Sequence, residues 1–182
     1  MDVKYHLENA WEHSISNVVP LVILTVVFMV VSICSIGILV PVAFAGYTNS
    51  LFQLLKNNRE PKPQDIFSQL NLFLPLFIFG IIVFIIVIVG FTLLIIPGLL
   101  VSTAISYLCL YMIPIMVDQK IELLYAIKKS SSMVTSTPIV DHIIIFCIFI
   151  AFTAIGGSSL LGFIFFQPFA TLFLLSVYEK QV

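Results

Sequence analysis

The stretch LFLPLFIFGIIVFIIVIVGFTLLII, residues 72–96, contains no charged side chain. A helix needs about 20 consecutive apolar residues to cross the hydrocarbon core of a bilayer. We therefore predict that these residues form a transmembrane helix. The whole chain has a matching composition, because 60% of its 182 residues are hydrophobic and only 9% are charged. Soluble domains carry about 25% charged residues, so the sequence predicts an integral membrane protein with a single transmembrane domain, residues 1–182.

Three apolar segments are each long enough for two crossings, and each contains glycine or proline near its middle. These segments occupy residues 18–56, 70–117 and 139–179. The expected breaks between the paired helices are Gly37 with Pro41, Pro97-Gly98, and Gly156-Gly157-Ser158-Ser159. The sequence therefore predicts an all-α membrane bundle of six transmembrane helices, arranged as three hairpins.

The helix expected over residues 39–56 is the weakest of the six, because its middle is polar. The polar side chains are Tyr47, Thr48, Asn49, Ser50 and Gln53. A segment of this kind either crosses the membrane inside a bundle or enters and leaves on one side as a re-entrant segment. The sequence leaves both alternatives open.

Residues 1–16 are predicted to form an amphipathic helix rather than a crossing. Apolar residues recur at helical spacing, at Val3, Leu7, Ala10, Trp11 and Ile15. Such a helix, with the only tryptophan of the chain on its apolar stripe, is typical of the membrane interface. Packing beneath the bundle is a compatible alternative.

A second amphipathic helix is expected within residues 118–137. The last hairpin is then expected to begin at Thr137-Pro138, with the threonine as the cap and the proline at the first helical position. Both amphipathic helices would lie at the interface and connect or flank the hairpins.

Basic residues fall only in the polar segments between the predicted hairpins and at the two ends of the chain. They are Lys4, Lys56, Arg59, Lys62, Lys120, Lys128, Lys129 and Lys180. Six crossings place all of them on one face, which the positive-inside rule assigns to the cytoplasm. We therefore expect a multi-pass protein of the plasma (inner) membrane, with both termini cytoplasmic.

Few ionisable residues fall within the predicted crossings, where they would mark a functional site. Asp141 and His142 are the only close titratable pair, and their place near a predicted helix start puts them at headgroup level. The three cysteines lack metal-ligand spacing, and no catalytic or phosphate-binding motif is present. We expect no enzyme activity and no cofactor. The net charge of -1 also argues against a nucleic-acid partner.

Two sets of residues are candidates for contacts with a solute, a lipid or a partner. The first set, for a polar path or close helix contacts, is Asn49, Ser102, Ser106, Pro114, Gln167 and Pro168. The second set, for lipid headgroups at the interface, is Trp11, Lys128, Lys129, Asp141 and His142. Prolines inside crossings kink helices, and small residues let helices approach closely.

Three short motifs resemble a group of poorly characterised prokaryotic six-helix membrane proteins. The group includes the membrane domain of some glycerophosphoryl diester phosphodiesterases. The motifs are PQDIFS at 63–68, a helix that opens with PGLLV at 97–101 and ends with PIMVD at 114–118, and AIKKS at 126–130. The resemblance covers most of the chain. It implies a six-helix membrane fold and carries over no catalytic residue.

The sequence favours a non-enzymatic membrane subunit or scaffold, which binds a membrane-protein partner, a second copy of itself or lipid. The alternative is a small channel or transporter for a small solute, which would use Asn49, Gln167 and the helices kinked at Pro114 and Pro168. An enzyme acting on lipid headgroups through Asp141 and His142 is a third alternative. The ligand, the partner and the oligomeric state do not follow from the sequence.

The predicted topology is testable by cysteine labelling in a variant without the three native cysteines. Gly157→Cys places a thiol at an expected external turn, and we predict that a membrane-impermeant maleimide labels it on intact cells. Lys129→Cys, on the expected cytoplasmic side, should react only after the cells are opened. Labelling of position 129 but not 157 on intact cells would contradict the predicted orientation.

Overall fold

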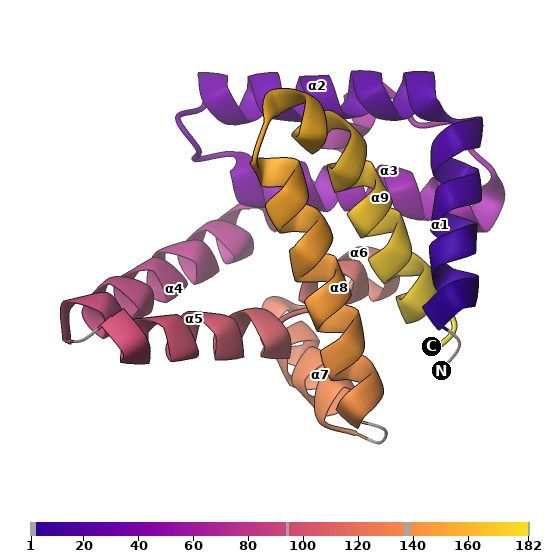
Figure 1. Cartoon of the computed structure of the whole chain (residues 1–182). Helices are drawn as coiled ribbons and strands as arrows, with labels where there is room; N and C mark the ends of the chain where they lie inside the picture. Colours follow the sequence, from indigo (N-terminus) through magenta and orange to yellow (C-terminus); the bar gives the residue numbers. More distant parts are fainter. Residues whose placement is uncertain (1–2, 94, 137–138, 182) are drawn as a thin grey trace.

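The computed structural model describes residues 3–93, 95–136 and 139–181, and Figure 1 shows their arrangement. The regular secondary structure of these residues is helical throughout, which confirms the all-α prediction for this part of the chain. The elements are α1 (Val3–Ser16), α2 (Val18–Cys34), α3 (Val40–Asn57), η1 (Pro63–Phe67), η2 (Leu70–Leu72), α4 (Phe73–Leu93), α5 (Ile95–Leu108), α6 (Met112–Gln119), α7 (Leu123–Thr135), α8 (Ile139–Gly157) and α9 (Leu160–Glu179).

Two of the three predicted turns overlap the observed ones, although Pro41 lies in the first turn of α3 and Gly156-Gly157 ends α8. α2 and α3 are joined through residues 35–39, where Ile36 and Gly37 adopt φ values of 51° and 82°. α8 and α9 are joined through residues 158–159, and the Ser159 hydroxyl caps α9 by accepting a hydrogen bond from the Gly162 backbone. Thr137-Pro138, the predicted start of the last hairpin, lies outside the described residues.

The middle hairpin turns earlier than the sequence predicts. α4 ends at Leu93 and α5 begins at Ile95, so Pro97 and Gly98 lie in the first turn of α5. Proline is tolerated there, because the N–H group it lacks would have no partner within the helix. The prediction that Pro97-Gly98 separates the two helices is therefore wrong by a few residues.

Several helices are long and apolar enough to cross a membrane, which is the pattern of a multi-pass membrane protein. Among the described residues they are Pro63–Thr92, Ile95–Gln119, Ile139–Gly157 and Leu160–Glu179. α1 and α2 qualify only as a pair, and the pair bends by 89°. The described residues therefore support four or five crossings by length and composition, and α3 is not among them.

α3 runs through the middle of the fold, and protein covers three of its polar side chains, whereas Asn49 and Gln53 are only partly buried. It packs against α2, α4, α6, α9 and both 3-10 turns. Tyr47, Thr48 and Ser50 are buried, and the Tyr47 hydroxyl lies 3.1 Å from Thr25 Oγ1 of α2. The polar middle that makes this helix a poor match for lipid is therefore accommodated inside the protein.

The chain that follows α3 folds back over it, because Gly46 leaves room. A Cβ atom at position 46 would overlap the carbonyl oxygen of Ile66 and would lie 2.6 Å from the carbonyl oxygen of Asp65. Only glycine fits here, since both contacts are with backbone atoms that cannot rotate away.

α1 packs along α9 and leaves its tryptophan at the surface. His6 Nδ1 lies 2.8 Å from Ser176 Oγ, and both side chains are buried. The Trp11 ring meets Phe169 edge-on, with 6.1 Å between ring centroids, yet Trp11 remains 61% exposed. The helix predicted at 1–16 is thus packed against the rest of the protein on one side and exposed on another.

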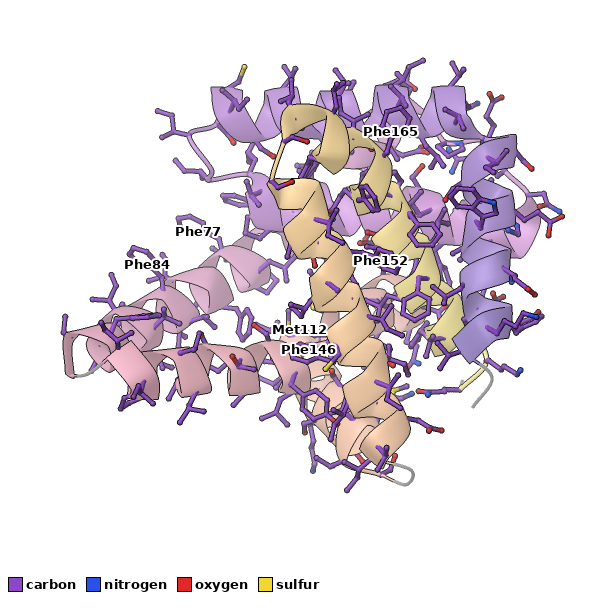
Figure 2. All side chains as sticks on the ribbon, viewed as in Figure 1. Phe77, Phe84, Met112, Phe146, Phe152 and Phe165 are labelled. Carbon is purple, nitrogen blue, oxygen red and sulfur yellow. The ribbon has the colours of Figure 1, made fainter. Side chains whose placement is uncertain are left out.

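α4 and α5 extend together away from the other helices in Figure 1, and we call this pair the α4–α5 arm. Within the most apolar window of α4 only 6% of residues are buried, against 56% for α9. Figure 2 shows Phe77 and Phe84 standing out from α4 on the side away from α5. Gly90 and Gly98 let the two helices meet closely, because a Cβ at position 90 would lie 3.0 Å from Gly98 Cα.

The contact at Gly46 predicts a sharp difference between two glycine substitutions. Gly46→Ala forces η1 away from α3, so we expect the free energy of unfolding to fall by about 1–3 kcal/mol or more, as for other overpacked sites. Gly80→Ala on α4, where a Cβ meets nothing within 4 Å, should leave stability unchanged or slightly raised. Unfolding in mixed micelles, followed by circular dichroism, measures both. Equal losses would contradict the proposed contact.

Candidate functional site

Polar side chains from three helices meet where α3, α6 and α9 end. Lys56 Nζ donates a hydrogen bond to Asp118 Oδ1 at 3.0 Å, and the Tyr178 hydroxyl donates one to Asp118 Oδ2 at 2.9 Å. The Asp118 side chain is 17% exposed. One largely buried carboxylate therefore ties α3 and α9 to α6, and we call Lys56, Asp118 and Tyr178 the terminal cluster.

The terminal cluster extends to α7 through Gln119. Gln119 Nε2 donates to the Tyr178 hydroxyl at 3.1 Å, and Lys129 Nζ donates to Gln119 Oε1 at 2.6 Å. Lys120 ends α6 in a left-handed conformation, with φ of 52°, and its N–H bonds back to the Met116 carbonyl. This reversal brings α7 beside α6 and completes the network.

A cleft of about 300 Å³ adjoins the terminal cluster. Its polar lining consists of Asn49, Gln53, Lys56, Gln69, Asp118 and Lys120. Two ammonium groups face one carboxylate here, so the formal charge of the lining is positive. Ammonium and amide donors suit the oxygens of carboxylates and phosphates, although Lys56 already bonds to Asp118.

A second charged contact fixes the loop between α3 and α4. Asp65 accepts hydrogen bonds from Arg59 at 2.6 Å, from the Ser50 hydroxyl at 2.8 Å and from the Lys62 backbone at 3.1 Å. The Asp65 side chain is only 11% exposed. A carboxylate with three donors is well compensated for burial, and it holds η1 in place over α3.

A mainly apolar cavity of about 400 Å³ lies between α3, α5, α6, α8 and α9. Ser106 and Pro114, both predicted for a polar path, line it together with Thr48, Thr153 and Thr171. Each of these threonine hydroxyls already donates to a carbonyl of its own helix. The cavity therefore offers an incoming solute little hydrogen-bonding capacity from these three residues.

The other residues predicted for a polar path lie elsewhere. Asn49 lines the cleft at the terminal cluster and donates to Ser68 Oγ at 3.1 Å. Gln167 is buried within α9, and Pro168 lines a groove beside α1. Ser102 donates to the Leu99 carbonyl of its own helix at 3.0 Å. The structure thus brings Ser106 and Pro114 together at this cavity and places Asn49, Ser102 and the adjacent pair Gln167 and Pro168 elsewhere.

The residues predicted to meet lipid headgroups are also dispersed. Trp11 is exposed on α1, and Lys128 is exposed on α7, where Lys129 bonds to Gln119. His142 is only 3% exposed, and its Nδ1 lies 3.4 Å from the Tyr111 hydroxyl. Asp141, next to it on α8, is half-buried.

Sequence reasoning missed Asp118 and Tyr178 as partners. They are 60 residues apart, and no local periodicity links two positions at that separation. Lys56 entered the sequence analysis only as a marker of topology. The one available signal was the position of Asp118 directly after an apolar run, where a carboxylate is near enough to the membrane to need a partner.

Comparisons with known proteins leave the family open. No family model, no curated protein and no solved structure matches the chain. The resemblance of three short motifs to the six-helix membrane group therefore stays a prediction.

The terminal cluster predicts that Asp118→Asn lowers the free energy of unfolding by about 1–3 kcal/mol, because it removes the charge that accepts two hydrogen bonds. The ion pair with Lys56 contributes only a small part of this free energy, because the Lys56 side chain is 39% exposed and solvent screens its charge. Tyr178→Phe should cost about 1 kcal/mol. Tyr125→Phe on α7, where the side chain is 67% exposed, is the control and should change stability by less than about 0.5 kcal/mol.

Both tyrosine variants lose one hydroxyl, so unfolding in mixed micelles compares them directly. Equal effects of Tyr178→Phe and Tyr125→Phe would show that the cluster does not stabilise the fold. A double-mutant cycle between positions 118 and 178 should give a coupling of about 1 kcal/mol, and zero coupling would contradict the hydrogen bond.

Proposed function

We propose that the protein is a non-enzymatic subunit of a membrane assembly, and that it binds another membrane protein through the α4–α5 arm. A second copy of the chain is the simplest such partner, because most oligomers are homo-oligomers. We place it in the plasma (inner) membrane, with six crossings and both termini in the cytoplasm.

The observation that carries this proposal is the low burial of α4. A helix inside a bundle buries the face that it turns to its neighbours, yet only 6% of the apolar window of α4 is buried. Gly80 lies open on this helix, since a Cβ there would meet nothing within 4 Å. Small residues let helices approach closely in membranes, so α4 offers a partner helix a place to pack.

Six crossings are supported by the distribution of charge. The basic residues that flank the hairpins include Lys56 and Lys129, which belong to one network with α6 and α9. This network gathers the ends of α3, α6 and α9 on one side, as the positive-inside rule requires for a cytoplasmic face. α3 crosses in this proposal as a helix enclosed by protein, and a re-entrant α3 is the alternative.

A small channel or transporter is the second candidate. The cavity that contains Ser106 and Pro114 favours it. The mainly apolar lining and the dispersal of Asn49 and Gln167 favour the subunit instead. A polar solute would need donors and acceptors along a continuous path.

The proposal predicts that Gly80→Leu breaks the assembly and leaves the fold intact, because a bulky side chain obstructs a close helix contact. Gly157→Leu is the matched control, since a Cβ at either position meets nothing within 4 Å. Particles extracted from membranes with polymer, without detergent, are weighed by native mass spectrometry. The wild type and Gly157→Leu should contain at least one further protein chain beside the 20.3 kDa subunit.

Gly80→Leu should instead give particles with a single chain. Two results would contradict the proposed function: wild-type particles with one chain only, or identical assemblies for Gly80→Leu and the wild type. The mass of the additional chain also separates a second copy from a different membrane protein.

A further inference from the structure

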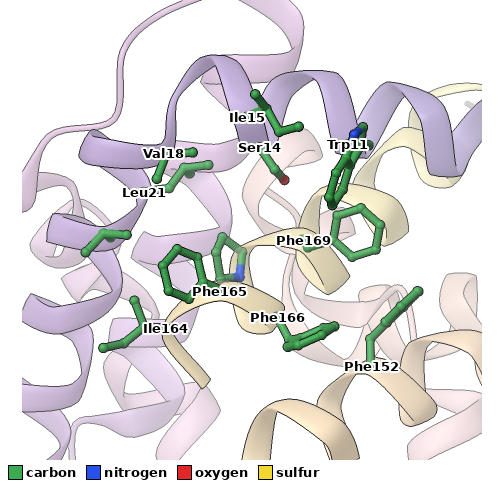
Figure 3. A pocket seen from close by; sticks show the side chains of 12 residues that line it. Trp11, Ser14, Ile15, Val18, Leu21, Phe152, Ile164, Phe165, Phe166 and Phe169 are labelled. Carbon is green, nitrogen blue, oxygen red and sulfur yellow. The ribbon is translucent and has the colours of Figure 1, made fainter. Parts of the chain in front are cut away.

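Two cavities of similar volume have opposite linings. The groove beside α1 and the cleft beside the terminal cluster each have about 300 Å³. Figure 3 shows Trp11, Phe165 and Phe169 at the groove, and the described residues that line it include no charged side chain. The cleft is lined instead by two lysines, one aspartate and three side-chain amides, above two apolar side chains. Of these two cavities, the cleft is the one that offers partners to a charged ligand.

The charges that line the cleft do not cancel. Asp118 already accepts hydrogen bonds from Lys56 at 3.0 Å and from Tyr178 at 2.9 Å. Lys120 is exposed and forms no ion pair with another described residue. The lining therefore has one positive charge in excess, that of Lys120. Lys56 adds to it, because an ammonium group has three N–H donors and Asp118 takes one of them.

Two side-chain amides add hydrogen-bond donors beside this positive charge. Gln53 accepts a hydrogen bond on Oε1 from Asn57 at 2.6 Å, so its NH2 group remains available. The Gln69 side chain forms no hydrogen bond within the described part of the chain. Asn49 already gives one N–H to Ser68. The cleft thus combines positive charge with free N–H donors, a combination that an anion rich in oxygen atoms satisfies.

The donors fit a phosphate group better than a carboxylate. Both cations of the lining are lysines, and no arginine is among its described residues. Arginine holds a planar carboxylate through two parallel hydrogen bonds, whereas lysine binds phosphate as a compact charge. The donors also come from three directions: from α3, from the end of α6 and from the segment before η2. A phosphate accepts from several directions because it has more oxygen atoms than a carboxylate.

Lys120 has a backbone conformation that other residues adopt more easily. Its φ is 52°, and its N–H bonds back to the Met116 carbonyl. Glycine is the usual residue at such a helix end, and a side chain in this conformation costs about 1–2 kcal/mol. The chain therefore keeps a long cationic side chain here at a cost in backbone energy. A cation also complements the negative end of α6, so the test must separate that role from binding.

A second cavity suggests two sources for the phosphate. Lys120 also lines a mainly apolar cavity of about 490 Å³ between the start of α4 and α7. Glu122 lies in that lining and repels an anion, which keeps the phosphate on the side of the cleft. A phospholipid headgroup bound at Lys120 has apolar surface beside it for the rest of the lipid. A soluble phosphate ester uses the cleft alone.

We propose that the cleft binds a phosphate group, with Lys120 as its main charge partner and Gln53 and Gln69 as hydrogen-bond donors. The phosphate belongs to an anionic phospholipid or to a soluble phosphate ester, and the experiment distinguishes these sources. No residue of the α4–α5 arm lines the cleft. The proposed subunit role and the phosphate site can therefore fail independently of each other.

The first arm of the test presents the phosphate in a lipid. The full chain in dodecyl maltoside is mixed with equal amounts of phosphatidylglycerol, which has a net negative charge, and phosphatidylcholine, which has none. Native mass spectrometry counts the bound lipids. The wild type should prefer phosphatidylglycerol, and Lys120→Gln should lower that preference roughly 2- to 5-fold, as for an exposed charge contact. Lys128→Gln removes the same charge from an exposed lysine outside the cleft and should keep the wild-type preference.

The second arm presents the phosphate without a lipid. Glycerol phosphate is added to the same proteins in phospholipid-free micelles, and the width of its phosphorus NMR signal reports binding. Broadening by the wild type and Lys128→Gln but not by Lys120→Gln supports the proposal and shows that a soluble ester is sufficient. Selectivity in the lipid arm alone assigns the lipid as the source. The proposal is overturned if Lys120→Gln and Lys128→Gln behave alike in both arms, even if Lys120→Gln lowers the melting temperature through the end of α6.

A neutral substitution tests whether the ligand lies in the cleft. Gln69→Ala removes one amide donor, and Gln64→Ala makes the same change at an exposed residue that does not line the cleft. Gln69→Ala should weaken the binding of phosphatidylglycerol or glycerol phosphate, whichever the wild type binds, roughly 2- to 10-fold, as for one hydrogen bond. Gln64→Ala should bind as the wild type does. Equal binding by the two variants places the ligand outside the cleft and overturns the proposal.

Discussion

The structure depends on one constraint: the polar groups of α3 cannot face lipid and must be satisfied by protein. A buried polar group without a hydrogen bond is costly in hydrocarbon. Tyr47 therefore meets Thr25, and Ser50 meets Asp65. The rest of the fold follows from this enclosure, because α2, α9 and η1 all pack on α3. Gly46 permits the closest of these contacts.

One region, the α4–α5 arm, contributes little to this enclosure and carries the proposed function. The α4–α5 arm keeps most of its apolar surface uncovered, and its contacts are mainly between its own two helices. The arm thus suits a protein helix. The terminal cluster around Asp118 ties together the ends of the core helices.

Periodicity and composition predicted the helices well, because the formation of each apolar helix depends mainly on the residues within that run. The last hairpin, 139–179, matches α8 and α9 almost residue for residue. Proline marks the position of a turn less reliably, since Pro97 is as acceptable in the first turn of a helix as between helices. The sites were harder to predict. Asp118 and Tyr178 meet only in the folded chain, and Asn49, predicted for a path, bonds to Ser68 on a neighbouring loop.

The enclosure of α3 can be measured directly by methyl NMR in lipid nanodiscs, with a lipid-soluble and a water-soluble paramagnetic agent. Leu51 on α3 has no exposed surface, whereas Ile85 on α4 is 55% exposed. A lipid with a nitroxide on its acyl chain should broaden the methyl signals of Ile85 and leave those of Leu51 sharp, and a gadolinium chelate in water should leave Leu51 sharp as well. Broadening of Leu51 by the lipid agent would show that α3 faces the bilayer, and broadening by the chelate would reveal a water-filled path. Either result would contradict a helix enclosed by protein.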